Sequence, residues 1–332
     1  MAMKKFINDP ADLTKELLDG YSLAYSDKIK LVSEKLVVRA KPKDKNKVAI
    51  VTLGGAGHEP ALSGFVGEGM LDISVVGDIF AAPGPPKVIE ALRMANREAG
   101  VLFVVLNHAG DVMSANLAME MAEKEGLNIK MILTHEDIAP GIDAPAEDKR
   151  GLVGCVPLYK IAGGAAEAGK TLEEVYKIAE KFNNNMATLA VAAKTATHPS
   201  TGQYIFDMAE DEMEIGMGQH GEGGTGRSKM MGANETAEAM LNPLLKAVDA
   251  KKGDSLLMLI NGVGATTLME LYIVFRHVHN LLADKGIKVE ARIGEFLTVQ
   301  EMAGFQMFVA KIDDELSTLW QSPCDTPYMT VR

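Results

Sequence analysis

The stretch Val101-Leu102-Phe103-Val104-Val105-Leu106, followed directly by Asn107-His108, decides the fold of this chain. Six consecutive apolar residues predict a strand buried on both faces, because a strand with one face in water alternates apolar and polar residues. Helix-like patterns lie on either side, at 86–99 and 115–125. A buried strand between two helices is the repeating unit of a parallel sheet. The stretch therefore predicts an α/β fold.

The same alternation extends outward from this strand in both directions. Residues 12–24 carry apolar side chains at helical spacing, and 47–53 form a β-branched run that ends at a glycine pair. Residues 73–76 and 129–133 predict two further strands. Ligands of such sheets bind beyond the carboxyl ends of the strands. We therefore expect the functional groups on the loops that follow strands.

The second half of the chain has a different pattern. We predict a helix over 171–194 and, after His198-Pro199, strands near 255–259, 289–293 and 307–311 with a helix over 267–283. A length of 332 residues exceeds one usual hydrophobic core, although a single large α/β domain stays possible. We predict two domains. The first predicted domain, residues 1–190, has a mostly parallel sheet flanked by helices. The second, residues 191–332, is a smaller α/β (α+β) layer domain that carries His220.

Composition and charge exclude several classes of function. The net charge of −11 argues against nucleic acid as a partner, and the apolar runs are too short to cross a membrane. Residues 1–10 have no apolar segment typical of a signal peptide, which predicts a cytoplasmic protein. Cys155 and Cys324 have no neighbours at metal-ligand spacing. We therefore expect inert thiols and no metal.

Three loops after predicted strands collect glycine and ionisable residues: Gly54–Pro60, Asn107–Asp111 and Gly216–Gly224. Glycine allows a backbone to turn with positive φ and to bring its N–H groups close to a ligand. Each loop is a candidate ligand cradle, and each also fits a tight turn that holds a structural His or Asp.

The third loop contains Gly216-x-Gly218-x-x-Gly221, which formally matches the dinucleotide fingerprint. That fingerprint requires a buried strand before it and a helix after it. Residues 207–214 are acidic and predict no buried strand, and more glycine follows. We therefore expect no nicotinamide cofactor. The first loop lacks the Gly-Lys-Ser/Thr ending of a phosphate-binding loop.

Two ionisable residues in these loops suggest chemistry. His220, among glycines and close to Glu222, is a candidate base, metal ligand or nucleophile whose tautomer the carboxylate would fix. Asp111 is a candidate base that accepts a proton from a substrate hydroxyl. The alternative for Asp111 is the N-cap of a helix over 112–125.

Beyond these loops, the chain resembles the substrate-binding subunit of the dihydroxyacetone kinase family, of the phosphotransferase-system-dependent type, over nearly its whole length. The similarity consists of many short motifs in the same order. They are Phe6–Pro10, Gly57–Pro60, Gly67–Leu71, Gly110-Asp111, Lys160–Gly163, His220–Glu222, Asn261–Thr266, Leu268–Tyr272, Gly294–Phe296 and Glu301–Phe305.

The resemblance implies a role for each candidate residue. His220 is expected to attack the carbonyl of a short-chain ketone and to hold it as a covalent hemiaminal. His58 is expected to hydrogen-bond the bound substrate, and Asp111 to take the proton of the hydroxyl that is phosphorylated. The expected substrate lining comprises Gly55, Ala56, Gly57, Leu106 and Ala82.

The resemblance also implies partners. No cofactor is expected in this chain, because ADP and magnesium belong to a separate L-type subunit that a phosphotransferase-system M protein recharges. A homodimer is the expected assembly. The implied activity is a ketose kinase that works only with its nucleotide-bearing partner.

Departures from the family pattern fall on the expected substrate lining. Many members have Lys-Asn-Tyr-Thr-Gly-Asp where this chain has Leu106–Asp111, and Phe-Thr-Ser-Pro where it has Phe80–Pro83. Gln219 replaces a common aliphatic residue. These changes make a C4 ketose such as erythrulose a candidate substrate beside dihydroxyacetone.

Two further functions compete with the kinase subunit. Some relatives keep the binding histidine but activate a transcription regulator, so a non-catalytic ketone sensor is the first. An oxidoreductase, based on Gly216–Gly221, is the second and is disfavoured by the context of that loop.

Overall fold

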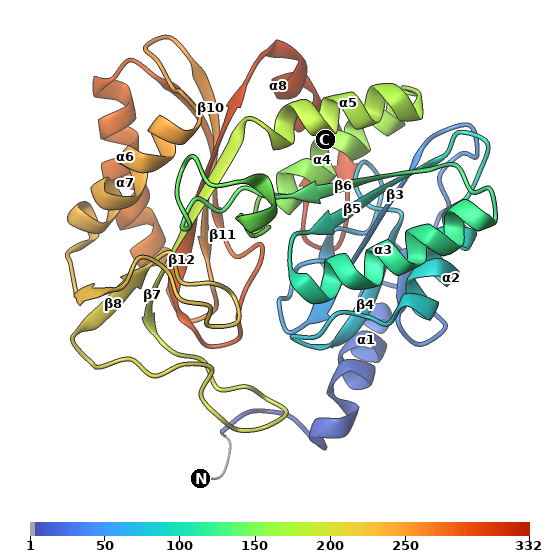
Figure 1. Cartoon of the computed structure of the whole chain (residues 1–332), viewed down its shortest axis with the longest axis horizontal. Coiled ribbons are helices and arrows are strands. Elements are labelled where there is room, and N and C mark those ends of the chain that lie inside the picture. Colours follow the sequence, from blue (N-terminus) through green and yellow to red (C-terminus); the bar gives the residue numbers. More distant parts are fainter. Residues whose placement is uncertain (1–3) are drawn as a thin grey trace.

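The computed structural model describes residues 4–332 and contains two six-stranded sheets that lie side by side (Figure 1). The first sheet has the order β1-β2-β4-β3-β5-β6, in which β4, β3, β5 and β6 are parallel. The strands are β1 (Ile29–Val32), β2 (Leu36–Arg39), β3 (Ala49–Ala56), β4 (Ile73–Ile79), β5 (Val101–Leu106) and β6 (Ile129–Thr134). The predicted α/β fold with a mostly parallel first sheet is confirmed.

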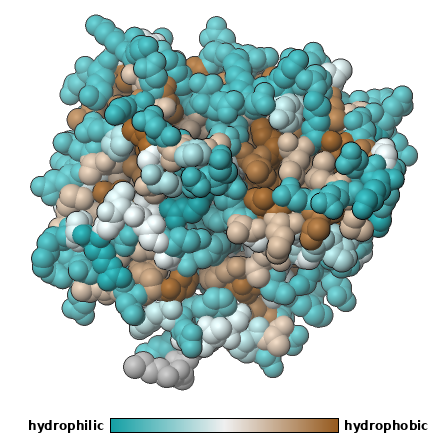
Figure 2. All heavy atoms as spheres, in the orientation of Figure 1, coloured by the Kyte–Doolittle hydropathy of each residue, from teal (hydrophilic) through white to brown (hydrophobic). Residues whose placement is uncertain are grey.

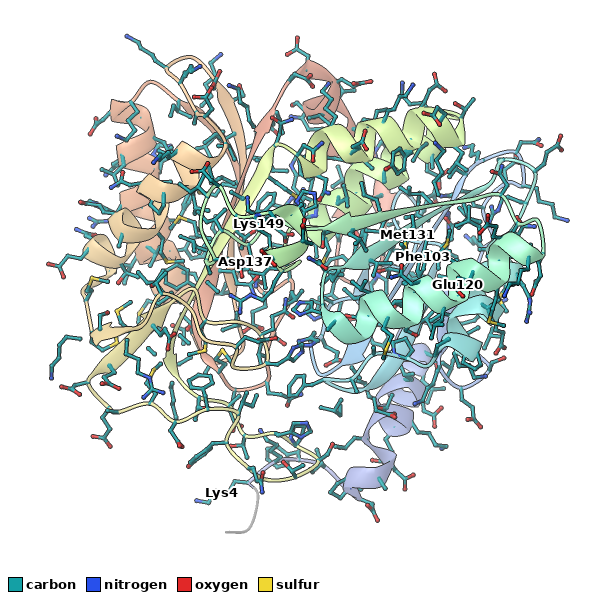
Figure 3. All side chains as sticks on the ribbon, viewed as in Figure 1. Lys4, Phe103, Glu120, Met131, Asp137 and Lys149 are labelled. Atoms are coloured by element: carbon teal, nitrogen blue, oxygen red, sulfur yellow. The ribbon has the colours of Figure 1, made fainter. Side chains whose placement is uncertain are left out.

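Helices cover both faces of this sheet. Helices α2 (Pro85–Ala95) and α3 (Ala109–Lys124) pack on one face, and α4 (Cys155–Glu167) and α5 (Leu172–Asn183) on the other. Along β5, alternate residues enter these two cores, and Phe103 lies on the α2/α3 side (Figure 3). This two-sided burial is why β5 reads as an uninterrupted apolar run. Helix α1 (Leu13–Ala24) contacts β1 and β4.

The second sheet is mixed and has the order β11-β10-β12-β7-β8-β9. Of its neighbouring pairs, only β10 and β11 run parallel. The strands are β7 (Met186–Lys194), β8 (Glu212–Ile215), β9 (Arg227–Lys229), β10 (Ser255–Gly262), β11 (Lys288–Gly294) and β12 (Ala303–Ile312). Helices α6 (Ala233–Ala247) and α7 (Leu268–Asp284) cover its outer face. Helix α8 (Asp314–Gln321) and the short pair β13 (Cys324–Asp325) and β14 (Thr330–Val331) complete the chain.

Helices α4 and α5 lie between the two sheets and share one core with both of them. Leu102 of the first sheet and Leu257 of the second belong to this core. Helix α4 approaches its neighbours closely, since a Cβ on Gly163 would lie 2.4 Å from the carbonyl oxygen of Gly69. A domain boundary near residue 190 stays a prediction, because β7 spans that residue and the core is continuous across it.

Two predictions along the chain are wrong. The helix predicted over 171–194 ends at Asn183, and 186–194 form β7 between β12 and β8. Pairing with two strands outweighs the helix preference of its alanines, because propensity is weaker than tertiary context. The acidic segment 207–214 was predicted to contain no buried strand, but its end forms the short strand β8 with the residue that follows. Met213 of this strand is buried.

Within residues 4–332, no helix combines the length and apolar character needed to span a bilayer. On the face drawn in Figure 2, hydrophilic residues dominate and hydrophobic ones gather to the right of the centre, in the region of α3. Met113, Leu117 and Met121, which follow one another at helical spacing on α3, are exposed there.

Candidate functional site

The candidate site lies where the carboxyl ends of β3, β4 and β5 meet, as the sequence predicts. The loop after β3 carries His58, the loop after β4 carries Phe80, and the segment after β5 carries His108 and Asp111. The chain passes from β3 to β4 on one side and continues to β5 on the other, and such switch points leave a crevice at the strand ends.

The loop between β8 and β9 brings His220 to the same point from the other half of the chain. The Nε2 atoms of His220 and His58 lie 3.1 Å apart. The two histidines line the same cavity. Its lining comprises Leu53, Gly54, Gly55, His58, Leu62, Phe80, Ala81, Ala82, Leu106, His108, Asp111, Gln219, His220 and Leu297.

The residues expected to line a substrate site divide into two groups. Gly55, Leu106 and Ala82 line the cavity. Ala56 is buried in the core instead, and the Gly57 amide donates to the Glu59 carboxylate at 3.1 Å. Of the glycine loop after β3, it is therefore the Gly54-Gly55 end that faces the cavity.

The loop that carries His220 is a hairpin connection with its own internal support. Gly216 and Gly221 have φ values of 87° and 83°, which favour glycine. The Gly218 amide donates to the carbonyl oxygen of Glu222 at 2.7 Å, and the Glu222 Oε2 accepts from the His220 amide at 2.8 Å. The element that follows is the exposed strand β9 and not a helix, so the loop lacks the setting of a dinucleotide site.

Hydrogen bonds at the two Nδ1 atoms fix the histidine tautomers. His58 Nδ1 lies 2.8 Å from the carbonyl oxygen of Thr298 and must donate to it, which leaves a lone pair on His58 Nε2. His220 Nδ1 lies 3.3 Å from Glu222 Oε1 and also faces an acceptor. A hydrogen bond across the contact between the two Nε2 atoms therefore requires a proton on one of them.

The electrostatic surroundings disfavour a proton on His58 Nε2. Burial, followed by the charge of His220, lowers the pKa of His58 to about 3. Burial raises the pKa of the Glu222 carboxyl, but its hydrogen bond and charge interaction with His220 outweigh this and hold the pKa well below its ordinary value. Glu222 is therefore ionised at neutral pH and His58 accepts a proton only transiently.

Asp111 lies in the first turn of α3, and its reading as the N-cap of a helix over 112–125 is wrong. The helix begins at Ala109 with His108 as the N-cap residue. Asp111 Oδ1 is buried, and it has no hydrogen-bond partner within residues 4–332. Burial raises the pKa of the Asp111 carboxyl to about 7, against an opposing effect of His220. An unpartnered carboxyl beside the cavity is available to accept a proton.

His108 is a member of the site that the sequence did not identify as functional. Its Nε2 lies 2.8 Å from the carbonyl oxygen of Gly151, and its ring centroid lies 5.4 Å from that of His220. Burial, followed by the charge of His220, lowers the pKa of His108 to about 4. Its position directly after β5, three residues before Asp111, is the signal that could have found it.

Arg150 holds the His220 loop against the rest of the protein. Its guanidinium donates to the carboxylate of the buried Asp137, which lies between the sheets, at 2.6 Å (Figure 3). It also donates to the carbonyl oxygen of Gly216 at 2.7 Å. Arg150 is therefore a positioning residue for the loop.

Replacing Arg150 should destabilise the protein. Arg150→Ala leaves the Asp137 carboxylate buried without its cation, which costs about 3–5 kcal/mol of unfolding free energy. Urea unfolding measures the loss. Lys229→Ala, which removes the exposed Lys229–Asp211 pair, is the control and should change stability by less than about 1 kcal/mol. Equal effects of the two substitutions would contradict the role of Arg150.

The site is thus a crevice at the ends of parallel strands that faces a histidine loop from a second sheet. The Dak1 domain family matches residues 19–328, and the chain belongs to this family. The predicted membership of the dihydroxyacetone kinase family is thereby confirmed.

Three similar proteins show the range of the family. A Listeria innocua protein, the dihydroxyacetone-binding subunit DhaK of a PTS-dependent dihydroxyacetone kinase, is 37% identical over 94% of this chain and 95% of its own length. A D-erythrulose kinase of Mycolicibacterium smegmatis is 36% identical over 98% of this chain and 56% of its own length. The solved structure of the dihydroxyacetone kinase operon co-activator Dha-DhaQ has a TM-score of 0.90 and 30% identity, covering 96% of this chain and 98% of its own.

Proposed function

We propose that this chain is the ketone-binding subunit of a ketose kinase, and that it holds its substrate covalently on His220 while a partner subunit transfers phosphate. The observation that carries the proposal is the 3.1 Å contact between the Nε2 atoms of His220 and His58 in a cavity that Asp111 also lines. Nucleophile, proton carrier and base are thereby within reach of one small substrate.

Addition to the carbonyl begins with a proton transfer between the two histidines. His58 Nε2 takes the shared proton and frees the lone pair on His220 Nε2. This lone pair forms a bond to the carbonyl carbon, and the electrons of the C=O π bond move to oxygen, which takes the proton from His58. The total charge is unchanged, because the alkylated His220 ring carries the positive charge that Glu222 already neutralises.

The low basicity of His58 suits this role. A group with a pKa of about 3 gives up a proton readily to an alkoxide, and the carbonyl oxygen of Thr298 keeps its ring in one orientation. Covalent addition also explains selectivity, because only an electrophilic carbonyl carbon can form the bond and a polyol such as glycerol cannot.

Asp111 is the base that takes the proton of the hydroxyl to be phosphorylated. Its Oδ1 atom is buried beside the cavity and has no hydrogen-bond partner within residues 4–332. No phosphate-binding loop motif is found in the chain, so we propose that a nucleotide-bearing subunit of the L type, with ADP and magnesium and recharged by an M protein, supplies the phosphate. The exposed Met113 and Leu117 on α3, the helix of Asp111, offer that partner an apolar contact.

The proposed substrate is dihydroxyacetone or a C4 ketose. Leu106 and Ala82 give the cavity an apolar wall where many family members have polar residues. The similarity to a D-erythrulose kinase is consistent with a longer ketose. We also propose that the protein acts in the cytoplasm and that it forms a homodimer. A second copy would cover the apolar face that the exposed Leu268, Met269 and Tyr272 form on α7.

A ketone sensor is the second candidate function. It is favoured by the TM-score of 0.90 with an operon co-activator, a protein named for regulation and not for phosphoryl transfer. A sensor keeps the covalent histidine but gains nothing from the base, so the presence of Asp111 with a raised pKa favours the kinase.

The two functions are separated by an assay with a panel of C3 to C5 ketoses, an L-type subunit and a phosphoryl donor. The kinase proposal expects phosphorylated product from at least one ketose. Adduct formation with every accepted ketose but no product, together with binding to a transcription regulator, would establish the sensor instead.

The pH profile of transfer should report Asp111. Its carboxyl must be ionised to accept a proton, and its pKa is about 7, so the rate at saturating ketose should rise with pH, reach half its maximum near pH 7 and level off above about pH 8. Below pH 6 the rate should fall about tenfold per pH unit. A stopped-flow or coupled assay from pH 5.5 to 8.5 measures the profile, and a flat profile would contradict this role.

A further inference from the structure

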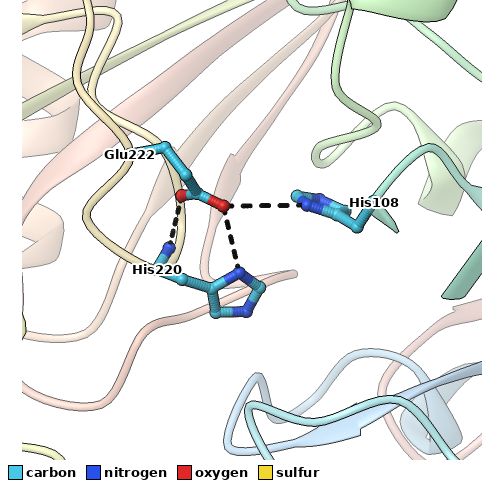
Figure 4. Close-up of side chains that lie close together, drawn as sticks. All are labelled: His108, His220 and Glu222. Atoms are coloured by element: carbon cyan, nitrogen blue, oxygen red, sulfur yellow. Dashed lines mark hydrogen bonds and ion pairs between the residues drawn. The ribbon is translucent and has the colours of Figure 1, made fainter. Parts of the chain in front are cut away.

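His108, His220 and Glu222 bring three potential ligand atoms together beside the cavity, with both imidazole rings facing the Glu222 carboxylate (Figure 4). Glu222 Oε1 lies 3.3 Å from His220 Nδ1 and 3.9 Å from His108 Nδ1, and the three atoms lie within 4.8 Å of one another. Ligand atoms of a tetrahedral zinc ion, with bonds near 2.1 Å, are about 3.4 Å apart. The His220–Glu222 pair already has that spacing, and the distance between His108 Nδ1 and Glu222 Oε1 exceeds it by about 0.5 Å.

The tautomer of His108 is the one that a metal ion requires. Its Nε2 faces the carbonyl oxygen of Gly151 at 2.8 Å and must donate, so the Nδ1 lone pair faces the ionised Glu222 carboxylate. Two electron-rich atoms facing each other repel unless a cation lies between them. Metal-binding histidines typically donate their other N–H to a carbonyl or carboxylate, and Gly151 provides that outer partner here.

A metal ion on His220 Nδ1 also resolves the contact between the two rings. With Nδ1 coordinated, the ring hydrogen resides on Nε2 and donates to the lone pair of His58 Nε2 at 3.1 Å. His58 still donates to Thr298. Every nitrogen of the three histidines then has a complementary partner without an additional proton.

The charges around the cluster tolerate a cation. Glu222 contributes a negative charge, its Oε2 is held by the His220 amide, and its side chain is 39% exposed, which gives an ion access from solvent. The nearby guanidinium of Arg150 is neutralised by its ion pair with Asp137. Two imidazoles and one carboxylate suit zinc and similar transition metals, whereas magnesium prefers oxygen ligands.

We propose that His108 Nδ1, His220 Nδ1 and Glu222 Oε1 form a three-ligand site for a divalent transition metal ion such as Zn²⁺, and that the bound ion competes with carbonyl addition. A neutral imidazole has one lone pair, so coordination through Nδ1 leaves none on Nε2 for the carbonyl carbon. The competition rests on the proposed covalent role of His220, whereas the binding does not. The site depends on His108, which stands where many family members have tyrosine, and it departs from the expectation of no metal in this chain.

Binding is tested on the full-length, metal-free protein. Titration with Co²⁺, followed by its visible absorption, should show one ion per chain in a site with nitrogen ligands, and Zn²⁺ should displace it. His108→Phe should weaken Zn²⁺ binding by at least about a hundredfold, more than the loss of an outer partner typically causes. His277→Phe, at the exposed His277–Glu238 pair, is the matched control and should bind as the unchanged protein does. Absence of the cobalt spectrum, or equal affinity of His108→Phe, would overturn the site.

Competition is tested by the rate at which ¹³C-carbonyl-labelled dihydroxyacetone forms its adduct. One equivalent of Zn²⁺ should slow the unchanged protein at least tenfold, and should leave the rate of His108→Phe at its own metal-free value. Should His108→Phe fail to fold, His108→Tyr replaces it. Bound zinc without slowing overturns the competition. Failure of the metal-free protein to form any adduct would refute the proposed function. The metal site would then be judged by the cobalt titration, which does not depend on adduct formation.

Discussion

His220→Ala should abolish the covalent adduct and lower the affinity for ketose by at least about a hundredfold, which corresponds to about 2.8 kcal/mol. The other two histidines of the cavity, His58 and His108, are poor substitutes, because their pKa values are lowered to about 3 and about 4. The nearest nitrogen, His58 Nε2, lies 3.1 Å from His220 Nε2, but its pKa of about 3 makes it a weak nucleophile. Calorimetric titration with dihydroxyacetone and with erythrulose measures the loss.

The control for this substitution is His277→Ala, which removes the hydrogen bond between His277 on α7 and Glu238 on α6. It should leave the affinity for ketose within twofold. His220→Gln tests whether the ring is needed for its shape or for its lone pair, since glutamine fills part of the volume without a nucleophilic nitrogen. Retained tight binding by either His220 variant would show that the ketose is held by hydrogen bonds alone.

Asp111→Asn should spare the adduct and slow phosphoryl transfer by about 10²–10⁴-fold, the usual contribution of a general base. The amide preserves the size of the side chain at the start of α3 but cannot accept a proton from the substrate hydroxyl. The measurement compares adduct formation with the rate of product formation in the presence of the nucleotide-bearing partner.

Asparagine at 111 should change the free energy of unfolding little, because one polar side chain of the same size replaces another at a position whose Oδ1 has no hydrogen-bond partner within residues 4–332. Urea unfolding of the variant checks that a slow rate does not come from loss of folding. Glu120→Gln, on the exposed side of the same helix, is the matched control (Figure 3). Equal transfer rates for Asp111→Asn and the unchanged protein would show that Asp111 is not a base and only contributes a negative charge in the first turn of a helix.

The first sheet could be predicted because its strands are buried on both faces. Val101–Leu106 is apolar throughout, so one short stretch is sufficient to indicate β5 and its flanking helices. The second sheet is harder to predict from the sequence. Its strand β7 is rich in alanine, which favours helix locally, and only pairing with β12 and β8 makes it a strand.

The candidate site could likewise be predicted only in part. Its loops could be located, since strand ends followed by glycine and ionisable residues occur in sequence. The contact between His58 and His220 joins residues 162 positions apart, and no local pattern predicts its distance or its shared proton. His108 and Arg150 were overlooked because their roles arise from what faces them, namely Glu222 and Asp137, and not from their own neighbours in the chain.

The central claim is a bond between His220 Nε2 and a carbonyl carbon, and NMR of the ¹⁵N-histidine-labelled protein with [2-¹³C]dihydroxyacetone tests it most directly. The account predicts that the ketone carbon resonance is replaced by that of a tetrahedral carbon with one-bond coupling to a ring nitrogen, and that His220→Ala lacks this signal. A bound ketone or hydrate resonance without coupling to nitrogen would contradict it.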